Sequence, residues 1–150
     1  PSGDFVLRDG DKPLVLISGG VGITPTLAML IAALRGQRPV HFIHAARHQG
    51  VHAFRAQIDE LAAQHPQLKR YYCYAEHAGE QAAPGAAAPD AVGLLDKDSL
   101  GSWLPASRDV DAYFLGPQPF MRAMKGYLRE LGVPEAQTHY EFFGPASALN

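Results

Sequence analysis

Cysteine, long apolar runs and an excess of charge of one sign are what this sequence lacks. Its single cysteine, Cys73, excludes an intramolecular disulfide and is typical of a reducing compartment, so we expect a cytoplasmic protein. No apolar run approaches the length of a membrane span, and we expect no stable membrane insertion. A formal net charge of −2, with both signs interspersed, offers no basic surface to nucleic acid. What remains is a globular chain of 150 residues, enough for one domain with a hydrophobic core.

Metal-dependent and hydrolytic chemistry also find little support. His44, His48 and His52 have the spacing of metal ligands on one helical face, but the expected elements place them on a strand end, a loop and a helix start. Cys73 falls in an aromatic strand and is better explained as a small buried residue than as a nucleophile. No Ser/His/Asp set or pair of hydrolase carboxylates stands out. We therefore predict no metal site.

A glycine-rich turn between an apolar run and an amphipathic segment is the most informative stretch. Residues 14–17 are continuously apolar, as in a strand that is buried on both faces. Gly20 and Gly22 follow and allow close backbone approach. Thr24 can cap a helix with Pro25 at its first position, so the pattern predicts a helix that begins at Thr24.

This turn suits a phosphate group, because a helix N-terminus presents unpaired N–H groups and the positive end of its dipole. The alternative is purely steric, since tight turns between a strand and a helix also use glycine. Pro25 occupies the third glycine position of the usual dinucleotide fingerprint, and no Lys-Ser or Lys-Thr pair indicates a P-loop. We expect a β-branched residue at Gly22 to abolish dinucleotide binding with little loss of the fold.

Strands and helices alternate along the rest of the chain. The expected strands are 14–17, 40–44, 70–75, 111–115 and 138–143. Four helices are expected. The first begins at Thr24, and the second has apolar residues at positions 51, 54, 58 and 61. The third spans 98–104, and the fourth has a buried stripe over 120–131. Residues 77–93 have no apolar periodicity and indicate a surface loop, whose role the pattern does not reveal. The pattern predicts an α/β fold, a doubly wound five-stranded parallel sheet with helices on both faces.

In such a sheet a ligand binds outside the carboxyl ends of the strands, where the strand order reverses. The glycine turn, residues 44–47, Gly116 and residues 141–144 all follow expected strands. We therefore expect them to line one crevice.

Four motifs in order resemble a known family. SGGVGITP, FLGPQPFM and YEFFGP are similar to the pyridine-nucleotide half of the ferredoxin reductase superfamily. HAARHQGVHAF together with THYEFFGP resembles, more specifically, the C-terminal reductase domain of bacterial flavohaemoglobins. The resemblance implies a ferredoxin reductase-like NAD-binding domain over residues 10–150. It also implies that residues 1–9 are the tail of a preceding FAD-binding domain.

The resemblance implies roles for two glycine-containing turns. The residues expected to hold the NAD pyrophosphate are Gly20, Val21, Gly22, Ile23, Thr24 and Pro25. Gly116 and Pro117 would border the nicotinamide ribose. Phe120 and Met121 begin the next helix, but both fall on its buried stripe, so packing is the better explanation for them.

The C-terminal motif would face the flavin. The residues concerned are Glu141, Phe142, Phe143, Gly144 and Pro145. An aromatic ring there would stack on the isoalloxazine, and a carboxylate would tune its reduction potential, so Glu141 and Phe143 are the predicted catalytic residues. The alternative is an ordinary edge strand with a solvated Glu141.

The residues that would bind the adenosine half of the dinucleotide are marked less specifically by the sequence. Dinucleotide folds place an acidic residue about 20 positions after the glycines, but this region offers Arg47 and no carboxylate before Asp59. Arg47 could bind a 2′-phosphate and so favour NADPH, whereas the flavohaemoglobin resemblance implies NADH. We expect NADH.

The resemblance thus predicts a domain that delivers hydride from NAD(P)H to FAD of an adjacent domain. In a flavohaemoglobin, electrons then reach haem in a globin domain for nitric oxide dioxygenation. The partners would be the FAD-binding and globin domains of the same parent chain, and the isolated fragment is expected to be inactive. Two alternatives are the reductase domain of an iron–sulfur oxygenase system and a non-catalytic nucleotide-binding domain.

Overall fold

The computed structural model describes residues 7–48, 51–76 and 89–141 of the chain. Within these ranges the elements are β1 (Leu14–Gly19), η2 (Gly20–Gly22), α1 (Ile23–Ala33), β2 (Val40–Ala46), α2 (Arg55–Gln64), β3 (Leu68–Tyr74), β4 (Ala91–Val92), α3 (Lys97–Trp103), β5 (Asp111–Leu115), α4 (Gln118–Glu130), η5 (Glu135–Gln137) and β6 (Thr138–Tyr140). The strands form one six-stranded sheet in the order β4-β3-β2-β1-β5-β6, and every neighbouring pair is parallel.

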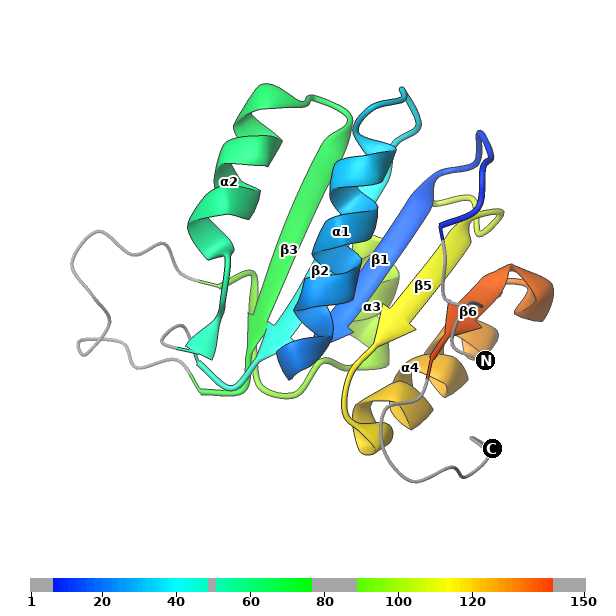
Figure 1. The fold of residues 1–150 in the computed structure, drawn as a ribbon. Coiled ribbons are helices and arrows are strands. Elements are labelled where there is room, and N and C mark those ends of the chain that lie inside the picture. Colours follow the sequence, from blue (N-terminus) through cyan, green and yellow to red (C-terminus); the bar gives the residue numbers. More distant parts are fainter. Residues whose placement is uncertain (1–6, 49–50, 77–88, 142–150) are drawn as a thin grey trace.

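β1 lies inside the sheet, between β2 and β5 (Figure 1). From β1 the chain adds β2, β3 and β4 on one side, and then returns to add β5 and β6 on the other. α1 and α2 cover one face of the sheet, and α3 and α4 cover the opposite face (Figure 1). The strand order therefore reverses between β1 and β5, where a doubly wound sheet binds its ligand.

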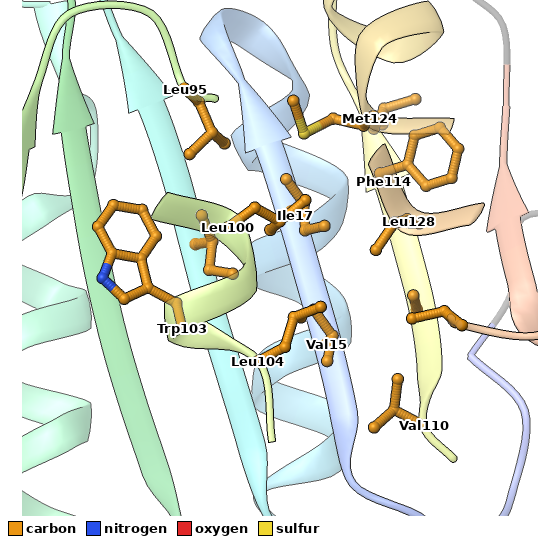
Figure 2. Close-up of a cluster of buried hydrophobic side chains, with 14 of the residues drawn as sticks. Val15, Ile17, Leu95, Leu100, Trp103, Leu104, Val110, Phe114, Met124 and Leu128 are labelled. Atoms are coloured by element: carbon orange, nitrogen blue, oxygen red, sulfur yellow. The ribbon is translucent and has the colours of Figure 1, made fainter. Parts of the chain in front are cut away.

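Burial of both faces explains the continuous apolar run of β1, in which all six residues are buried. Leu14 and Leu16 belong to the core beneath α1 and α2. Val15 and Ile17 point the other way and pack with side chains from α3 and α4, as Figure 2 shows. Because successive side chains of a strand alternate between the faces, one strand supports both cores.

The predicted fold class is confirmed, but the sheet has six strands instead of five. The added strand, β4, consists of only two residues and lies in the part of the chain that we expected to be loop. A strand of this length has no periodicity for a sequence pattern to reveal. β6 is described from Thr138 to Tyr140, and the predicted end of this strand at Phe143 lies outside the described residues.

The second helix begins later than its apolar spacing predicts. Val51 and Phe54 were expected on its buried stripe, but they are 52% and 46% exposed and precede the helix. Phe54 has a φ of 62°, the left-handed conformation, directly before Arg55. Ile58 is the residue of α2 that is fully buried. None of the helices in the described ranges has the length and apolar content that a membrane span requires.

Candidate functional site

The turn after β1 differs in detail from the sequence prediction. Gly20–Gly22 form one 3-10 turn, and α1 begins at Ile23 with Gly22 as its N-cap and without a side-chain cap. The prediction that Thr24 caps the helix is therefore wrong, as is the placement of Pro25 at the first helical position. Pro25 is the third helical residue, which is still within the turn whose N–H groups have no helical acceptor.

Gly20 and Gly22 serve different purposes. Gly20 has a φ of +56°, and a Cβ atom built on it would meet no atom within 4 Å. A Cβ atom on Gly22 would lie 2.3 Å from the carbonyl oxygen of Leu115 in β5. Gly22 is thus required for the contact between α1 and the sheet, and the expectation that a larger residue here would spare the fold is wrong. Gly20 faces open space.

A cavity of about 760 Å³ lies at the carboxyl edge of the sheet. Its volume falls within the range of small-molecule and cofactor sites. The wall is formed by Gly19, Gly20, Val21, Ile23, Thr24, Ala45, Ala46, Arg47, Val51, Ala53, Cys73, Ala75, Glu76, Gly93, Leu94, Leu95, Pro117 and Phe120. These residues belong to or follow β1 to β5, so the cavity spans the point at which the strand order reverses.

The structure brings many of the predicted binding residues together. Those that line the cavity are Gly20, Val21, Ile23, Thr24, Arg47 and Pro117. Gly22, Pro25 and Gly116 are not part of the wall. Glu141 directly follows β6 and is half-buried, whereas Phe142, Phe143, Gly144 and Pro145 lie outside the described residues.

Gly116 is needed for packing inside the protein. A Cβ atom on it would lie 2.7 Å from Cδ2 of Phe120 and 3.1 Å from the carbonyl oxygen of Gly19. The Phe120 ring thus lies over the ends of β1 and β5, and it also lines the cavity. The interpretation of Phe120 as packing alone was incomplete, whereas Met121 is fully buried as expected.

Sequence reasoning missed a second group of wall residues, which follow β3 and β4. Glu76 comes two residues after β3, and its backbone N–H donates to the carbonyl oxygen of Arg47 over 2.8 Å. Leu94 follows β4 and is 86% exposed. The rule that ligands bind at the carboxyl ends of parallel strands would have indicated Glu76, but no pattern marked Leu94.

The wall is mainly apolar, and its charged side chains are Arg47 and Glu76. Cys73 is buried, and its thiol donates to the carbonyl oxygen of Gly93 over 3.2 Å. Burial raises the pKa of Cys73 to about 11, with a smaller contribution from Asp96. A thiol of this pKa is protonated at neutral pH, so the cavity contains no activated cysteine nucleophile.

Two of the three histidines that are spaced four residues apart lie close together in the structure. His44 lies in β2 and His52 lies just before α2, with ring centroids 4.5 Å apart. Among the described residues, no group of three or more His, Cys, Asp or Glu side chains could hold a metal ion.

The chain is similar to a known protein family and to several curated proteins. A family model described as an oxidoreductase NAD-binding domain matches residues 16–126. A flavohemoprotein from Pseudomonas putida is 68% identical over 149 residues, which make up 99% of this chain and 36% of that protein. A flavohemoprotein from a Burkholderia species is 65% identical over 150 residues, which make up 100% of this chain and 37% of that protein. The chain therefore spans little more than a third of the length of these curated relatives.

A solved structure has the same architecture. It is the flavohem-like FAD/NAD-binding domain of nitric oxide dioxygenase from Vibrio cholerae, which is 31% identical to this chain with a TM-score of 0.79. The match covers 97% of this chain and 56% of that one.

Proposed function

Because the chain belongs to the family of oxidoreductase NAD-binding domains, we propose that it is the dinucleotide-binding domain of a flavohaemoprotein. In this proposal, residues 10–150 form the NAD-binding domain and residues 1–9 are the tail of a preceding FAD-binding domain. The identities of 68% and 65% to two flavohemoproteins support this assignment over an iron–sulfur oxygenase reductase or a non-catalytic nucleotide-binding domain.

The observation that carries the proposal is the cavity at the strand-order reversal, with the turn from Gly20 to Thr24 at its edge. Gly20 has open space where a side chain would be, so a ligand can approach its backbone closely. The first turn of α1 adds the positive end of a helix dipole. A pyrophosphate would therefore bind at this turn.

The rest of the cavity suits the two ends of a dinucleotide. Pro117 and Phe120 form the wall beside β5, where the nicotinamide would lie. Val51 and Leu94 form apolar wall on the β2 and β4 side, where adenine would lie. The bound dinucleotide would supply hydride, and the domain's own task is to orient it and exclude water.

Glu141 and the four residues that follow it would face the flavin of the adjacent domain. β6 pairs with β5, so Glu141 and Pro117 both follow strands at the carboxyl edge of the sheet. A carboxylate and an aromatic ring in this position would tune and cover the flavin, which is the role proposed for Glu141 and Phe143. In the whole protein, electrons would pass on to haem in a globin domain for nitric oxide dioxygenation. The isolated domain would lack turnover, because the flavin and haem sites lie mainly in the other domains.

NADH is the preferred coenzyme in this proposal. The carboxylate of Glu76 can accept a hydrogen bond from a ribose 2′-hydroxyl and would repel a 2′-phosphate. Arg47 lines the same wall and would favour the phosphate, and the backbone N–H of Glu76 donates to the carbonyl oxygen of Arg47, so the two residues are neighbours in the wall. Titration of the Glu76→Gln variant with NADH and NADPH tests this point. We expect the preference for NADH to fall by about tenfold, and an unchanged preference would contradict the role of Glu76.

The phosphate site can be tested by placing a negative charge on the exposed Thr24. An acidic residue in the first turn stabilises a helix by about 0.3–1 kcal/mol, so Thr24→Asp should keep or raise the melting temperature. The same charge should repel a pyrophosphate and weaken NAD⁺ binding by about tenfold or more.

Thr24→Asn is the matched neutral control and should bind NAD⁺ nearly as well as the unmodified chain. Calorimetry and thermal unfolding of the 150-residue chain measure both effects. Equal NAD⁺ affinity of the Asp and Asn variants would contradict the proposed site.

A further inference from the structure

A pair of buried histidines lies behind the cavity wall. His44 in β2 and His52 just before α2 have ring centroids 4.5 Å apart, with the ring planes tilted by 38°. Nδ1 of His44 is 2.8 Å from Oγ of Ser18, and Nδ1 of His52 is 2.7 Å from Oη of Tyr74. Both imidazoles are buried. The pair therefore links β1, β2 and β3 to the segment that precedes α2.

Each member of this network is next in the chain to a residue of the cavity wall. Gly19 follows Ser18, Ala45 follows His44, Ala75 follows Tyr74, and Val51 and Ala53 flank His52. The three strand ends are fixed by the ladder of the parallel sheet. Val51 and Ala53 lie outside any strand. The backbone N–H of Val51 donates to the carbonyl oxygen of His48 over 3.2 Å, and the side chain of His52 adds a link to β3.

The hydrogen bonds suit a neutral His52. Nη1 of Arg55 donates to Oη of Tyr74 over 2.8 Å, which leaves the hydroxyl proton of Tyr74 free to donate to Nδ1 of His52. In this arrangement the proton of the neutral imidazole lies on Nε2. Nε2 of His52 and Nε2 of His44 are both buried without a hydrogen-bond partner among the described residues. An added proton on His52 would go to Nδ1 and displace the bond donated by Tyr74, and a charged ring at either position would be buried with its Nε2–H group unpaired within the described ranges.

The charged groups near the pair are Arg55 and Asp59 of α2 and Arg70 of β3, which donates to Asp59 over 2.6 Å. Arg55 and His52 both contact the hydroxyl of Tyr74. Asp59 lies 3.6 Å from Arg55 and accepts a 2.6 Å hydrogen bond from the hydroxyl of Tyr72. Tyr72 in turn contacts the His52 ring edge-on, with centroids 4.5 Å apart. α1, which covers the same face of the sheet, has no titratable side chain. Asp59 is thus engaged by other partners, and Arg55 is a cation that opposes protonation of His52.

Backbone strain directly after this segment shows that it is held in place. Phe54 adopts a φ of 62° although its side chain remains 46% exposed. Such strain persists only where the surrounding structure determines it. Phe54 lies between two residues that bond the Tyr74 hydroxyl, His52 and Arg55, and its own carbonyl oxygen accepts from the backbone N–H of Ile58 in α2.

We propose that the neutral pair of His44 and His52 positions Val51 and Ala53 as a wall of the dinucleotide cavity, so that uptake of a proton by the pair releases this wall and weakens dinucleotide binding. His52 is then a positioning residue for the coenzyme. The inference rests on the dinucleotide site assigned under Proposed function.

Electrostatics agrees with the geometry. Burial lowers the pKa of His44 to about 3, with a further contribution from His52. Burial and the charge of Arg55 lower the pKa of His52 to about 4, although Asp59 acts in the opposite direction. An opened segment would return both groups toward the ordinary value of about 6.5. Protons therefore bind the open form more tightly than the closed one below neutral pH.

The test is the pH dependence of NAD⁺ binding to the 150-residue chain. We expect the dissociation constant to rise by about fivefold or more between about pH 7.5 and about pH 5.5. His52→Gln keeps a polar side chain that can accept from Tyr74 but cannot take up a proton, so only His44 remains to titrate and the dissociation constant should rise clearly less than that of the unmodified chain. His65→Gln makes the same exchange at the C-terminal end of α2 and should follow the unmodified chain.

A flat profile of the unmodified chain, or an equally steep profile of His52→Gln, would overturn the inference. Should His52→Gln fail to fold by circular dichroism, Tyr74→Phe replaces it. Loss of the donating hydroxyl then favours the protonated ring, and the midpoint should move to higher pH, whereas an unmoved midpoint would also overturn the inference.

If Thr24→Asp leaves NAD⁺ binding intact, it is the proposed site that fails. If Thr24→Asp abolishes binding while His52→Gln keeps the steep profile, only the positioning role fails.

Discussion

Gly22 and Leu115 bring α1 and β5 into direct backbone contact, because a Cβ atom on Gly22 would lie 2.3 Å from the Leu115 carbonyl oxygen. Leu115 is the last residue of β5, so the contact joins the two elements at the strand-order reversal. The contact holds the glycine turn close to the end of β5.

Replacing Gly22 with alanine should lower the free energy of unfolding by about 1–3 kcal/mol, the usual cost of an overpacked contact. Gly126→Ala in α4 is the matched control, because a Cβ atom there meets nothing within 4 Å. That variant should be more stable by about 0.5–1 kcal/mol. Urea denaturation compares the two, and similar stabilities would contradict the close contact.

Replacing Phe54 with asparagine should lower the free energy of unfolding by less than about 1 kcal/mol. Removal of a ring that is 46% exposed loses its buried part, but asparagine adopts a positive φ more readily than phenylalanine and offsets this loss. Ile31→Asn exchanges a similarly exposed apolar residue within α1, where asparagine is a poorer helix former, and should cost about 1–2 kcal/mol. Urea denaturation compares the two variants, and an equal or larger loss at Phe54 would contradict the strain.

The buried histidines should make the fold sensitive to acid. Their pKa values of about 3 and about 4 in the folded chain lie below the ordinary value of 6.5, so the unfolded chain binds protons first as the pH falls. The contribution of the two histidines to stability is therefore fully present above pH 6.5 and is lost as the pH falls toward about 3. At about pH 5 each histidine should cost about 2 kcal/mol.

Urea denaturation at neutral and acidic pH measures this loss. A double variant, His44→Gln with His52→Gln, removes both titrating groups and should lose much less stability on acidification. Equal losses in the double variant and the unmodified chain would assign the acid sensitivity to other groups.

The sequence predicted the elements whose apolar pattern is long or unbroken. β5 has the predicted bounds, and α4 buries Met121, Met124 and Leu128 on the expected stripe. The start of α1 was mispredicted because Thr24 and Pro25 resemble a capped helix start, whereas the backbone of Gly22 already forms the N-cap. β4 was missed because two residues cannot display a period.

Residues of the candidate site could be predicted where they belong to a local motif after one strand. Residues that reach the site because of the strand order in the sheet could not. Gly20 and Thr24 were found from their own motif. Glu76 follows a predicted strand and could have been found from the rule on strand ends, but Leu94 reaches the cavity because the two-residue β4 pairs with β3, which local patterns do not specify. The approach of His44 to His52 likewise depends on the segment before α2 folding back over the sheet.

The position of β1 between β2 and β5 has a consequence for biosynthesis. β1 pairs with β5 along its length, yet β5 leaves the ribosome only after α1, β2, α2, β3, β4 and α3. Until then the nascent chain has one unsatisfied edge on its most apolar strand, and closing so large a loop is slow. Productive folding of this domain should therefore depend on protection of that edge during translation.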